Sequence, residues 1–168
     1  MIKDKVSIRP LEMEDLKFLH KWRNDKNIFD NLGGGYFPKS YSEMSEWMPS
    51  FVRNTNEQQR FIILYENNVV GFISLTNINH KNGTSELGLY LGEKNYLGKG
   101  IAKKSLNILM DYAKNTLNLR KISLNVLDDN DAAIHLYKKV NFVECGLKRE
   151  ERYVNGTYKN LLLMEVFL

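Results

Sequence analysis

The chain has 168 residues, of which 43% are hydrophobic, enough apolar sequence for one core, so we expect a single domain over residues 1–168. The formal net charge is +4, and the Lys and Arg residues are spread along the chain, which disfavours nucleic acid as a partner and favours a small anionic ligand. No apolar run approaches the length of a signal sequence or a membrane span, and the single cysteine fits a reducing compartment. The sequence therefore predicts a cytoplasmic protein with no membrane partner.

The first third of the chain reads as one strand followed by two helices. Val6 to Ile8 forms a short strand, and residues 12–24 carry apolar side chains at helical spacing. Three glycines and a proline interrupt helical sequence over residues 31–38, so we expect an open loop there. A second helix follows over residues 41–53.

The pattern then changes to strand periodicity. Strands are predicted at residues 60–65, 69–78 and 86–91, with turns at 66–68 and 81–83. Gly88 lies inside the last of these strands, where it indicates a β-bulge or a close approach of two backbones.

The second half alternates helices and strands. A helix is predicted from Ala102 to about Asn115, and a strand follows at 121–127. A second helix is predicted at 131–139, after a possible N-cap at Asn130. Strands at 142–154 and 157–167 then flank Asn155-Gly156, a strong hairpin signal. The predicted order is βααβββαβαββ, which indicates the α/β (α+β) class.

Residues 97–102, Leu-Gly-Lys-Gly-Ile-Ala, lie between a predicted strand and a predicted helix. Backbone N–H groups and the helix dipole can converge on an anion at such a position. Gly98 and Gly100 permit a close backbone approach, Lys99 adds a positive charge, and Ala102 keeps the first helical turn thin. The segment lacks the Gly-Lys-Ser/Thr ending of a Walker loop and the third glycine of a dinucleotide fingerprint.

This turn, together with Asn130-Asp131-Ala132-Ala133-Ile134-His135-Leu136-Tyr137-Lys138-Lys139 and Asn141-Phe142, resembles the GCN5-related N-acetyltransferase (GNAT) family. The similarity is greatest to the branch of spermidine, ribosomal-protein and aminosugar N-acetyltransferases. The resemblance implies a mixed, mostly antiparallel sheet flanked by helices, acetyl-CoA as co-substrate, no metal, and a homodimer as the favoured assembly.

The resemblance also implies a set of residues that bind acetyl-CoA. They are Leu89, Tyr90, Leu91, Leu97, Gly98, Lys99, Gly100, Ile101, Ala102, Lys103, Asn130, Ala133, Tyr137 and Lys139. Leu97 departs from the family, whose phosphate turn usually opens with Gln or Arg. Since most contacts in such a turn come from main-chain N–H groups, we expect weaker cofactor binding rather than none.

The mechanism that the resemblance implies is direct attack of a neutral amine on the thioester. Glu86 is the predicted base. The alternatives are that Glu86 is only an exposed or salt-bridged carboxylate, or that a chain of waters acts as the base. A main-chain N–H between Leu89 and Leu91 is expected to stabilise the oxyanion. Tyr137 is the predicted acid for the departing thiolate, although an aromatic residue on a helix is more often part of a core.

The acceptor amine is expected, by analogy with the family, near the first two helices, where Trp22, Asn24, Asp30 and Tyr36 are the predicted substrate-binding residues. The glycine loop lacks the carboxylates that would hold a polycation, so an aminosugar or another small amine is slightly favoured over a polyamine. A protein N-terminus as acceptor, and a non-catalytic acyl-CoA-binding module, are the alternatives.

Overall fold

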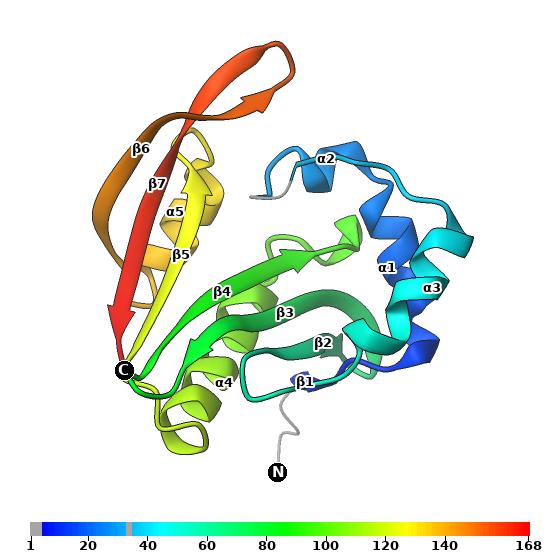
Figure 1. Ribbon diagram of the computed structural model, residues 1–168, viewed down its shortest axis with the longest axis horizontal. Helices are drawn as coiled ribbons and strands as arrows, with labels where there is room; N and C mark the ends of the chain where they lie inside the picture. The colour runs from blue at the N-terminus through cyan, green and yellow to red at the C-terminus, as the bar shows by residue number, and fades with distance from the viewer. Residues whose placement is uncertain (1–4, 33–34) are drawn as a thin grey trace.

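A computed structural model describes residues 5–32 and 35–168 of the chain. One sheet of seven strands runs through it in the order β1-β2-β3-β4-β5-β7-β6 (Figure 1). The strands are β1 (Val6–Pro10), β2 (Gln59–Tyr65), β3 (Asn68–Asn79), β4 (Thr84–Leu91), β5 (Lys121–Leu127), β6 (Val143–Val154) and β7 (Thr157–Phe167). The helices are α1 (Leu16–Arg23), α2 (Lys26–Phe29), α3 (Tyr41–Phe51), α4 (Ile101–Asn115) and α5 (Asp131–Lys138), with 3-10 turns at Met13–Asp15 and Lys94–Tyr96.

The predicted order of elements is confirmed, with one addition at the N-terminal end. The helix expected over residues 12–24 begins as a 3-10 turn and becomes regular only at Leu16. A further single turn, α2, lies between the first predicted helix and the predicted loop, where no element was predicted. The Asp25 side chain caps it by accepting a hydrogen bond from the Asn27 N–H at 2.9 Å.

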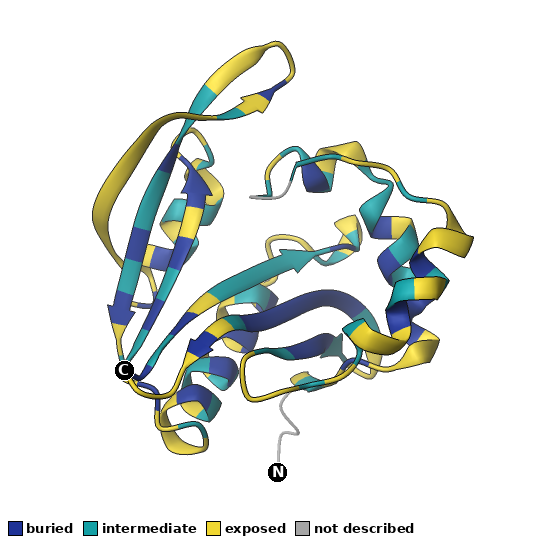
Figure 2. Cartoon of the chain, viewed as in Figure 1, coloured by how far each residue is buried: buried dark blue, intermediate teal, exposed yellow. Residues whose placement is uncertain are grey.

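Helices cover both faces of the sheet, and each face has its own apolar cluster. α4 and α5 pack on one face through Leu106, Leu109 and Tyr137, whereas α1 and α3 pack on the other. Consecutive residues of β2, Ile62 and Ile63, are both fully buried because each belongs to a different cluster. Figure 2 shows the contrast between the buried length of β3 and the exposed outer strand β6.

The only parallel pair among these strands, β4 and β5, is paired over three residues. Thr84 to Glu86 lie opposite Lys121 to Ser123, and beyond them the two strands separate (Figure 1). The remaining neighbours in the sheet are antiparallel. β4 therefore keeps one unpaired edge from residue 87 onward, and this edge forms the side of the site.

Gly88 makes a close approach to a side chain, rather than the bulge or the approach of two backbones that we expected. The register between β3 and β4 is continuous past Gly88, and a Cβ there would lie 2.7 Å from Ser74 Oγ. The irregularity lies instead in β3 after Thr76, where Asn77 has a φ of 49°.

Trp22 lies in the core, which argues against its predicted role in binding an acceptor. Its side chain is fully buried, and its Nε1 donates a hydrogen bond to Glu93 Oε1 at 3.0 Å. The indole packs so closely on the end of β4 that a Cβ on Gly92 would lie 2.1 Å from the ring. The helical spacing of Trp22 with the other apolar residues of this segment indicates a core position and not a ligand contact.

We expect Gly92→Ala to destabilise the protein by about 3 kcal/mol, since the indole or the backbone must shift to admit the methyl group. Gly146→Ala is the matched control, because its Cβ would meet Leu163 at an ordinary 3.9 Å. Urea unfolding of the two variants measures the difference. Equal midpoints would contradict the tight packing of Trp22.

Candidate active site

A cavity of about 890 Å³ occupies the opening between β4 and β5. We call it the donor cavity. Residues 86–91 of β4 line one side, residues 124–126 of β5 and residues of α5 line the other, and residues of α1, α2 and the segment after it reach its mouth. Its lining includes predicted cofactor residues from β4, from the turn and first residues of α4, and from α5 with its N-cap. They are Leu89, Tyr90, Leu91, Leu97, Ala102, Asn130, Ala133 and Tyr137.

The unpaired edge of β4 offers main-chain donors to this cavity. The Gly92 N–H donates toward β3, to the Val70 carbonyl at 2.9 Å, whereas the Gly83 carbonyl faces β5 and accepts from the Lys121 N–H at 3.1 Å. Because backbone groups alternate between the two edges of a strand, the N–H groups of Leu89 and Leu91 face the opening. They are suited to stabilise negative charge on an oxygen bound there.

The glycine turn before α4 has a backbone geometry suited to an anion. Gly98 and Gly100 both have a φ of 73°, a conformation that favours glycine, and a Cβ at either position would meet nothing within 4 Å. In the described part of the chain, no oxygen accepts a hydrogen bond from the backbone N–H groups of residues 98–103, and no side chain caps α4. Unpaired N–H groups at the N-terminus of a 15-residue helix fit the pyrophosphate of coenzyme A.

Leu97 stands at the entrance to this turn with 56% of its surface exposed. It also lines the donor cavity, next to the start of α4. Its side chain adds apolar surface but no hydrogen bond, so the turn depends on main-chain donors and on Lys99, whose ammonium lies 5.1 Å from the Tyr96 ring centroid.

We expect Leu97→Gln to lower the dissociation constant for acetyl-CoA by about threefold, because one added hydrogen bond contributes about 0.5–1.5 kcal/mol net. Isothermal titration calorimetry measures the change, and Leu97→Met controls for the altered shape. Equal affinity in all three proteins would show that this position does not contact the cofactor.

Tyr137 lies on α5 with its ring in the core and faces the donor cavity. Its ring centroid is 5.6 Å from that of Phe142, and burial raises the pKa of its phenol to about 12. Its hydroxyl makes no hydrogen bond to residues 5–32 or 35–168. The hydroxyl is not fully enclosed by protein atoms, so it is accessible from the cavity. At the start of the same helix, the Asn130 side chain accepts from the Ala133 N–H at 3.2 Å, which confirms the predicted N-cap and leaves its amide NH₂ free to donate.

Glu86 is exposed and lines the donor cavity on the opposite strand. Leu87 and Leu89 pack against the α4 side of the sheet, so Glu86 and Tyr90 project from the other face of β4, which α1 and α3 cover. No hydrogen bond or ion pair to the described residues engages the Glu86 carboxylate. It is therefore free to accept a proton, directly or through water.

Other predicted cofactor residues stand around the cavity rather than in its wall. Gly98, Lys99, Gly100 and Lys103 are exposed at the turn, and the Ile101 side chain is buried in the core, so only its N–H faces outward. Lys139 follows α5 at the end opposite Asn130 and is not part of the lining. The lining supports no contact between Lys139 and a ligand in the cavity.

The remaining predicted acceptor residues have structural partners. The Asn24 amide bridges the His20 and Lys39 carbonyls and accepts from the Lys39 N–H, which fastens α1 to the segment before α3. The Lys26 ammonium lies 5.9 Å from the Tyr36 ring centroid. Gly33 and Gly34, in the loop that we expected to shape the acceptor site, lie outside the described residues.

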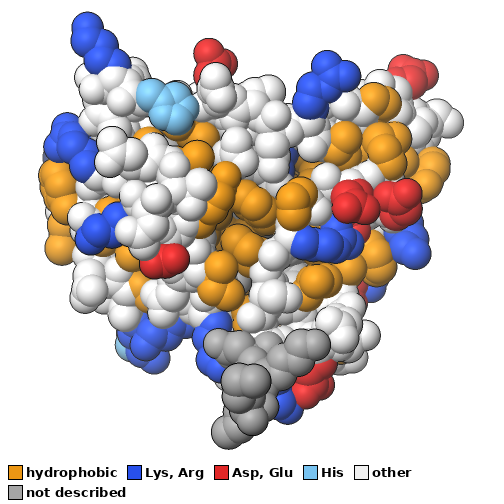
Figure 3. Space-filling model, turned by 90° about the horizontal axis from the view of Figure 1, so that it is seen from below, with side chains coloured by type: hydrophobic (Ala, Val, Ile, Leu, Met, Phe, Trp, Pro, Cys, Tyr) orange, Lys and Arg blue, Asp and Glu red, His pale blue; other side chains and the backbone are white. Residues whose placement is uncertain are grey.

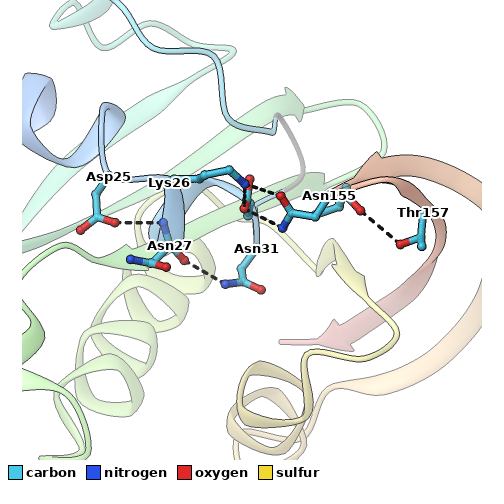
Figure 4. A network of polar contacts seen from close by, with 8 residues as sticks. Asp25, Lys26, Asn27, Asn31, Asn155 and Thr157 are labelled. Carbon is cyan, nitrogen blue, oxygen red and sulfur yellow. Dashed lines mark hydrogen bonds and ion pairs between the residues drawn. The ribbon is translucent and has the colours of Figure 1, made fainter.

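Polar contacts join α2 to the terminal hairpin, where Lys26 lies beside Asn155 (Figure 4), and Asp30 takes part in them. Its carboxylate binds the Lys26 ammonium, which lowers the pKa of that carboxyl, and accepts from Asn155 Nδ2 at 2.9 Å. A second bond runs from the Arg152 guanidinium to the Leu32 carbonyl at 2.8 Å. These contacts join the hairpin to the segment 27–32, several residues of which line the donor cavity, whereas Asp30 itself is not part of the lining.

Sequence reasoning missed most of the cavity mouth. Arg23, Asn27, Phe29 and Lys94 line it, and none belongs to a recognisable motif. The one available signal was Asp25, a residue type that favours the N-cap of a short helical turn, and it would have pointed to the segment with Asn27 and Phe29.

The chain belongs to the GNAT acetyltransferase family and is an acetyl-CoA-dependent N-acetyltransferase. The model of the acetyltransferase (GNAT) domain matches residues 5–143. A spermidine N(1)-acetyltransferase of Escherichia coli K12 is 31% identical over 164 residues, 96% of this chain and 86% of that protein.

Solved structures agree with this membership. Spermidine N-acetyltransferase from Vibrio cholerae in complex with CoA and spermine superposes with a TM-score of 0.90, at 31% identity, over 98% of this chain and 96% of that one. A structure of the same Vibrio cholerae enzyme described as dodecameric has a TM-score of 0.83, at 30% identity, over 98% and 95% of the two chains. The predicted family, fold and cofactor are confirmed.

Three further findings concern metal ions, membranes and surface charge. Among the residues described, no group of three or more His, Cys, Asp or Glu side chains could hold a metal ion. None of the described helices has the length and apolar character needed to cross a membrane. Lys and Arg side chains are scattered around the face in Figure 3 and interspersed with acidic ones.

Proposed function

We propose that the protein acetylates a primary amine of a small molecule by direct transfer, with both substrates bound together. The observation that carries the proposal is the opening between β4 and β5, which has main-chain donors on one side and the Tyr137 phenol on the other. Acetyl-CoA supplies an activated acetyl thioester. The chain contributes the groups that position and move protons around it.

Each group has one task in this proposal. Glu86 removes a proton from the ammonium form of the acceptor, directly or through water, because only the neutral amine is nucleophilic. The N–H groups of Leu89 and Leu91 donate to the oxygen on which negative charge develops. Tyr137 donates its proton to the departing sulfur, and its raised pKa keeps it protonated at neutral pH.

For the acceptor, the relatives support a polyamine ahead of the aminosugar that the sequence slightly favoured. The Escherichia coli relative is a spermidine N(1)-acetyltransferase, and the Vibrio cholerae enzyme was crystallised with spermine. Glu86, unpaired at the cavity, supplies a carboxylate for one ammonium group.

The test is release of free thiol from acetyl-CoA in the presence of spermidine, spermine, glucosamine and a short peptide with a free N-terminus. We expect turnover with the polyamines at a specificity constant at least tenfold above that with glucosamine. Turnover with the peptide alone would point to a protein N-terminus as acceptor. Binding of acetyl-CoA without thiol release from any amine would identify a non-catalytic acyl-CoA-binding module.

We also propose a multimer larger than the homodimer that the family resemblance suggested. The dodecameric Vibrio cholerae relative supports it. So does the outer strand β6, which carries the exposed apolar residues Val143 and Leu147 along an unpaired edge. Light scattering after size-exclusion chromatography distinguishes monomer, dimer and higher assembly.

A further inference from the structure

A second cavity, of about 410 Å³, adjoins the donor cavity on the α1 and α3 side of the sheet. We call it the aromatic cavity. The two share Arg23, Phe29, Phe72 and Tyr90 as lining residues, so they meet around the Tyr90 ring. Its volume lies in the range of roughly 300–1,000 Å³ that is common for small-molecule sites.

The wall of this cavity is made mainly of aromatic rings. Phe72 stacks on Tyr90 with centroids 5.5 Å apart, and Phe51 stacks on Phe72 at 6.1 Å. Trp47 meets Phe51 edge to face at 4.6 Å, and Phe29 meets Tyr90 at 5.5 Å. Such a wall favours a flat apolar group, which gains edge or face contacts as well as burial.

The charges on the wall disfavour a cation. Arg23 and Lys39 are its only charged residues, and no carboxylate of the described chain lines it. The Arg23 guanidinium lies 4.5 Å from the Phe29 ring centroid, so one aromatic face already holds a cation. A second ammonium group of a polyamine would therefore meet like charge here.

The carboxylates near the two cavities are already paired with lysines of the chain. Asp25 pairs with Lys94 at 3.2 Å, Glu93 with Lys21 at 2.7 Å, and Asp30 and Glu43 each with a lysine four residues away. Among residues 5–32 and 35–168, Glu86 is the one carboxylate that lines either cavity, and it has no such partner there. The Glu86 carboxylate can therefore pair with one ammonium group of an acceptor.

We propose that the aromatic cavity gives this enzyme a further activity, the acetylation of primary amines that carry one aromatic or bulky apolar group. The amine lies in the donor cavity beside the unpaired edge of β4, and the apolar group passes Tyr90 into the aromatic cavity. The Tyr90 hydroxyl makes no hydrogen bond to the described residues and lines both cavities, so it can accept one from the amine. This inference rests on the proposed acetyl transfer and extends its acceptors beyond polyamines.

The reaction balances without another reactant. The neutral amine forms an N–C bond with the acetyl carbon, the C–S bond breaks, the amine proton passes to the base, and the thiolate takes a proton from the acid. The products are an arylalkyl acetamide and free coenzyme A.

The test compares 2-phenylethylamine with ethylamine, which lacks the ring, at saturating acetyl-CoA and with rates referred to the unprotonated amine. We expect kcat/KM for 2-phenylethylamine to exceed that for ethylamine by at least about tenfold, as for other apolar groups that enter a fitted pocket. In Trp47→Ala this ratio should fall by at least about fivefold, and Trp47→Phe should restore most of it because a ring again closes the wall.

A binding measurement separates this inference from the proposed acetyl transfer. The chain has two tryptophans, and Trp22 is fully buried, so quenching of Trp47 by 2-phenylethylamine reports on the aromatic cavity, and Trp47→Phe should abolish it. Thiol release with spermidine, combined with a ratio near one and no saturable quenching, would overturn the aromatic subsite and leave the acetyltransferase intact. Saturable quenching without thiol release from any amine would overturn both the proposed transfer and the acetylation of aromatic amines, and would leave the aromatic cavity as a binding site only.

Discussion

Tyr137→Phe is expected to lower kcat by about 100-fold while leaving the dissociation constant for acetyl-CoA within twofold, since a positioned general acid contributes on the order of 10²–10⁴-fold. The substitution keeps the ring that packs on Phe142 and removes only the hydroxyl that opens to the donor cavity. Thermal unfolding should therefore be nearly unchanged. Steady-state kinetics with a good acceptor, together with calorimetry, measure both quantities.

The pH dependence of kcat gives a second test of the role of Tyr137. Burial raises the pKa of the Tyr137 phenol to about 12, and the phenol donates a proton only below that value. We expect no loss of kcat from this group as the pH rises from 7 to 10. An alkaline decrease centred near 9 that disappears in Tyr137→Phe would contradict the raised pKa, and a decrease in kcat below about threefold in the variant would remove Tyr137 as the acid.

Gly100→Val is expected to raise the dissociation constant for acetyl-CoA by at least about 30-fold. A left-handed conformation costs a non-glycine residue roughly 1–2 kcal/mol, and more when the side chain is β-branched. The turn will rotate out of this conformation and take the N–H groups at the start of α4 away from their common direction. The reason is conformational, because a Cβ at Gly100 would meet no atom within 4 Å.

Lys99→Gln is the matched control for this prediction. It removes a charge from the same exposed turn and leaves the backbone as it is, so we expect a change of about two- to fivefold that diminishes with added salt. If Lys99→Gln weakened binding as much as Gly100→Val, the site would depend on side-chain charge rather than on main-chain donors. Calorimetry at two salt concentrations distinguishes the two cases.

Much of the fold was predictable because its signals are local. Asn155 and Gly156 both have positive φ, of 49° and 89°, as an Asn-Gly hairpin turn requires, and the turn joins β6 and β7 as expected. Asn130 caps α5, and the two glycines of the phosphate turn adopt the backbone that only glycine takes easily. Each of these features is decided within a few residues.

The errors concern side chains whose partners are distant in the chain. Trp22 looked like a ligand-binding aromatic residue, but it is bonded to Glu93 and packed on Gly92. Asp30 looked like an acceptor residue, but its partners are Lys26 and Asn155, the latter 125 positions away. Sequence spacing gives no information on such pairs because they form only when the sheet brings the segments together.

The sequence by itself determined the family, the order of the elements and the phosphate turn before α4, because glycine backbone freedom, helix capping and apolar periodicity act over short stretches. Only the tertiary structure decided where the cavity opens and which residues line it. β4 and β5 separate after three paired residues, and this separation opens the cavity that both Glu86 and Tyr137 line. The aromatic cavity and the pairing of nearby carboxylates with lysines arise from contacts among α1, α2, α3 and the sheet, since charge balance and cavity shape are properties of the packed chain.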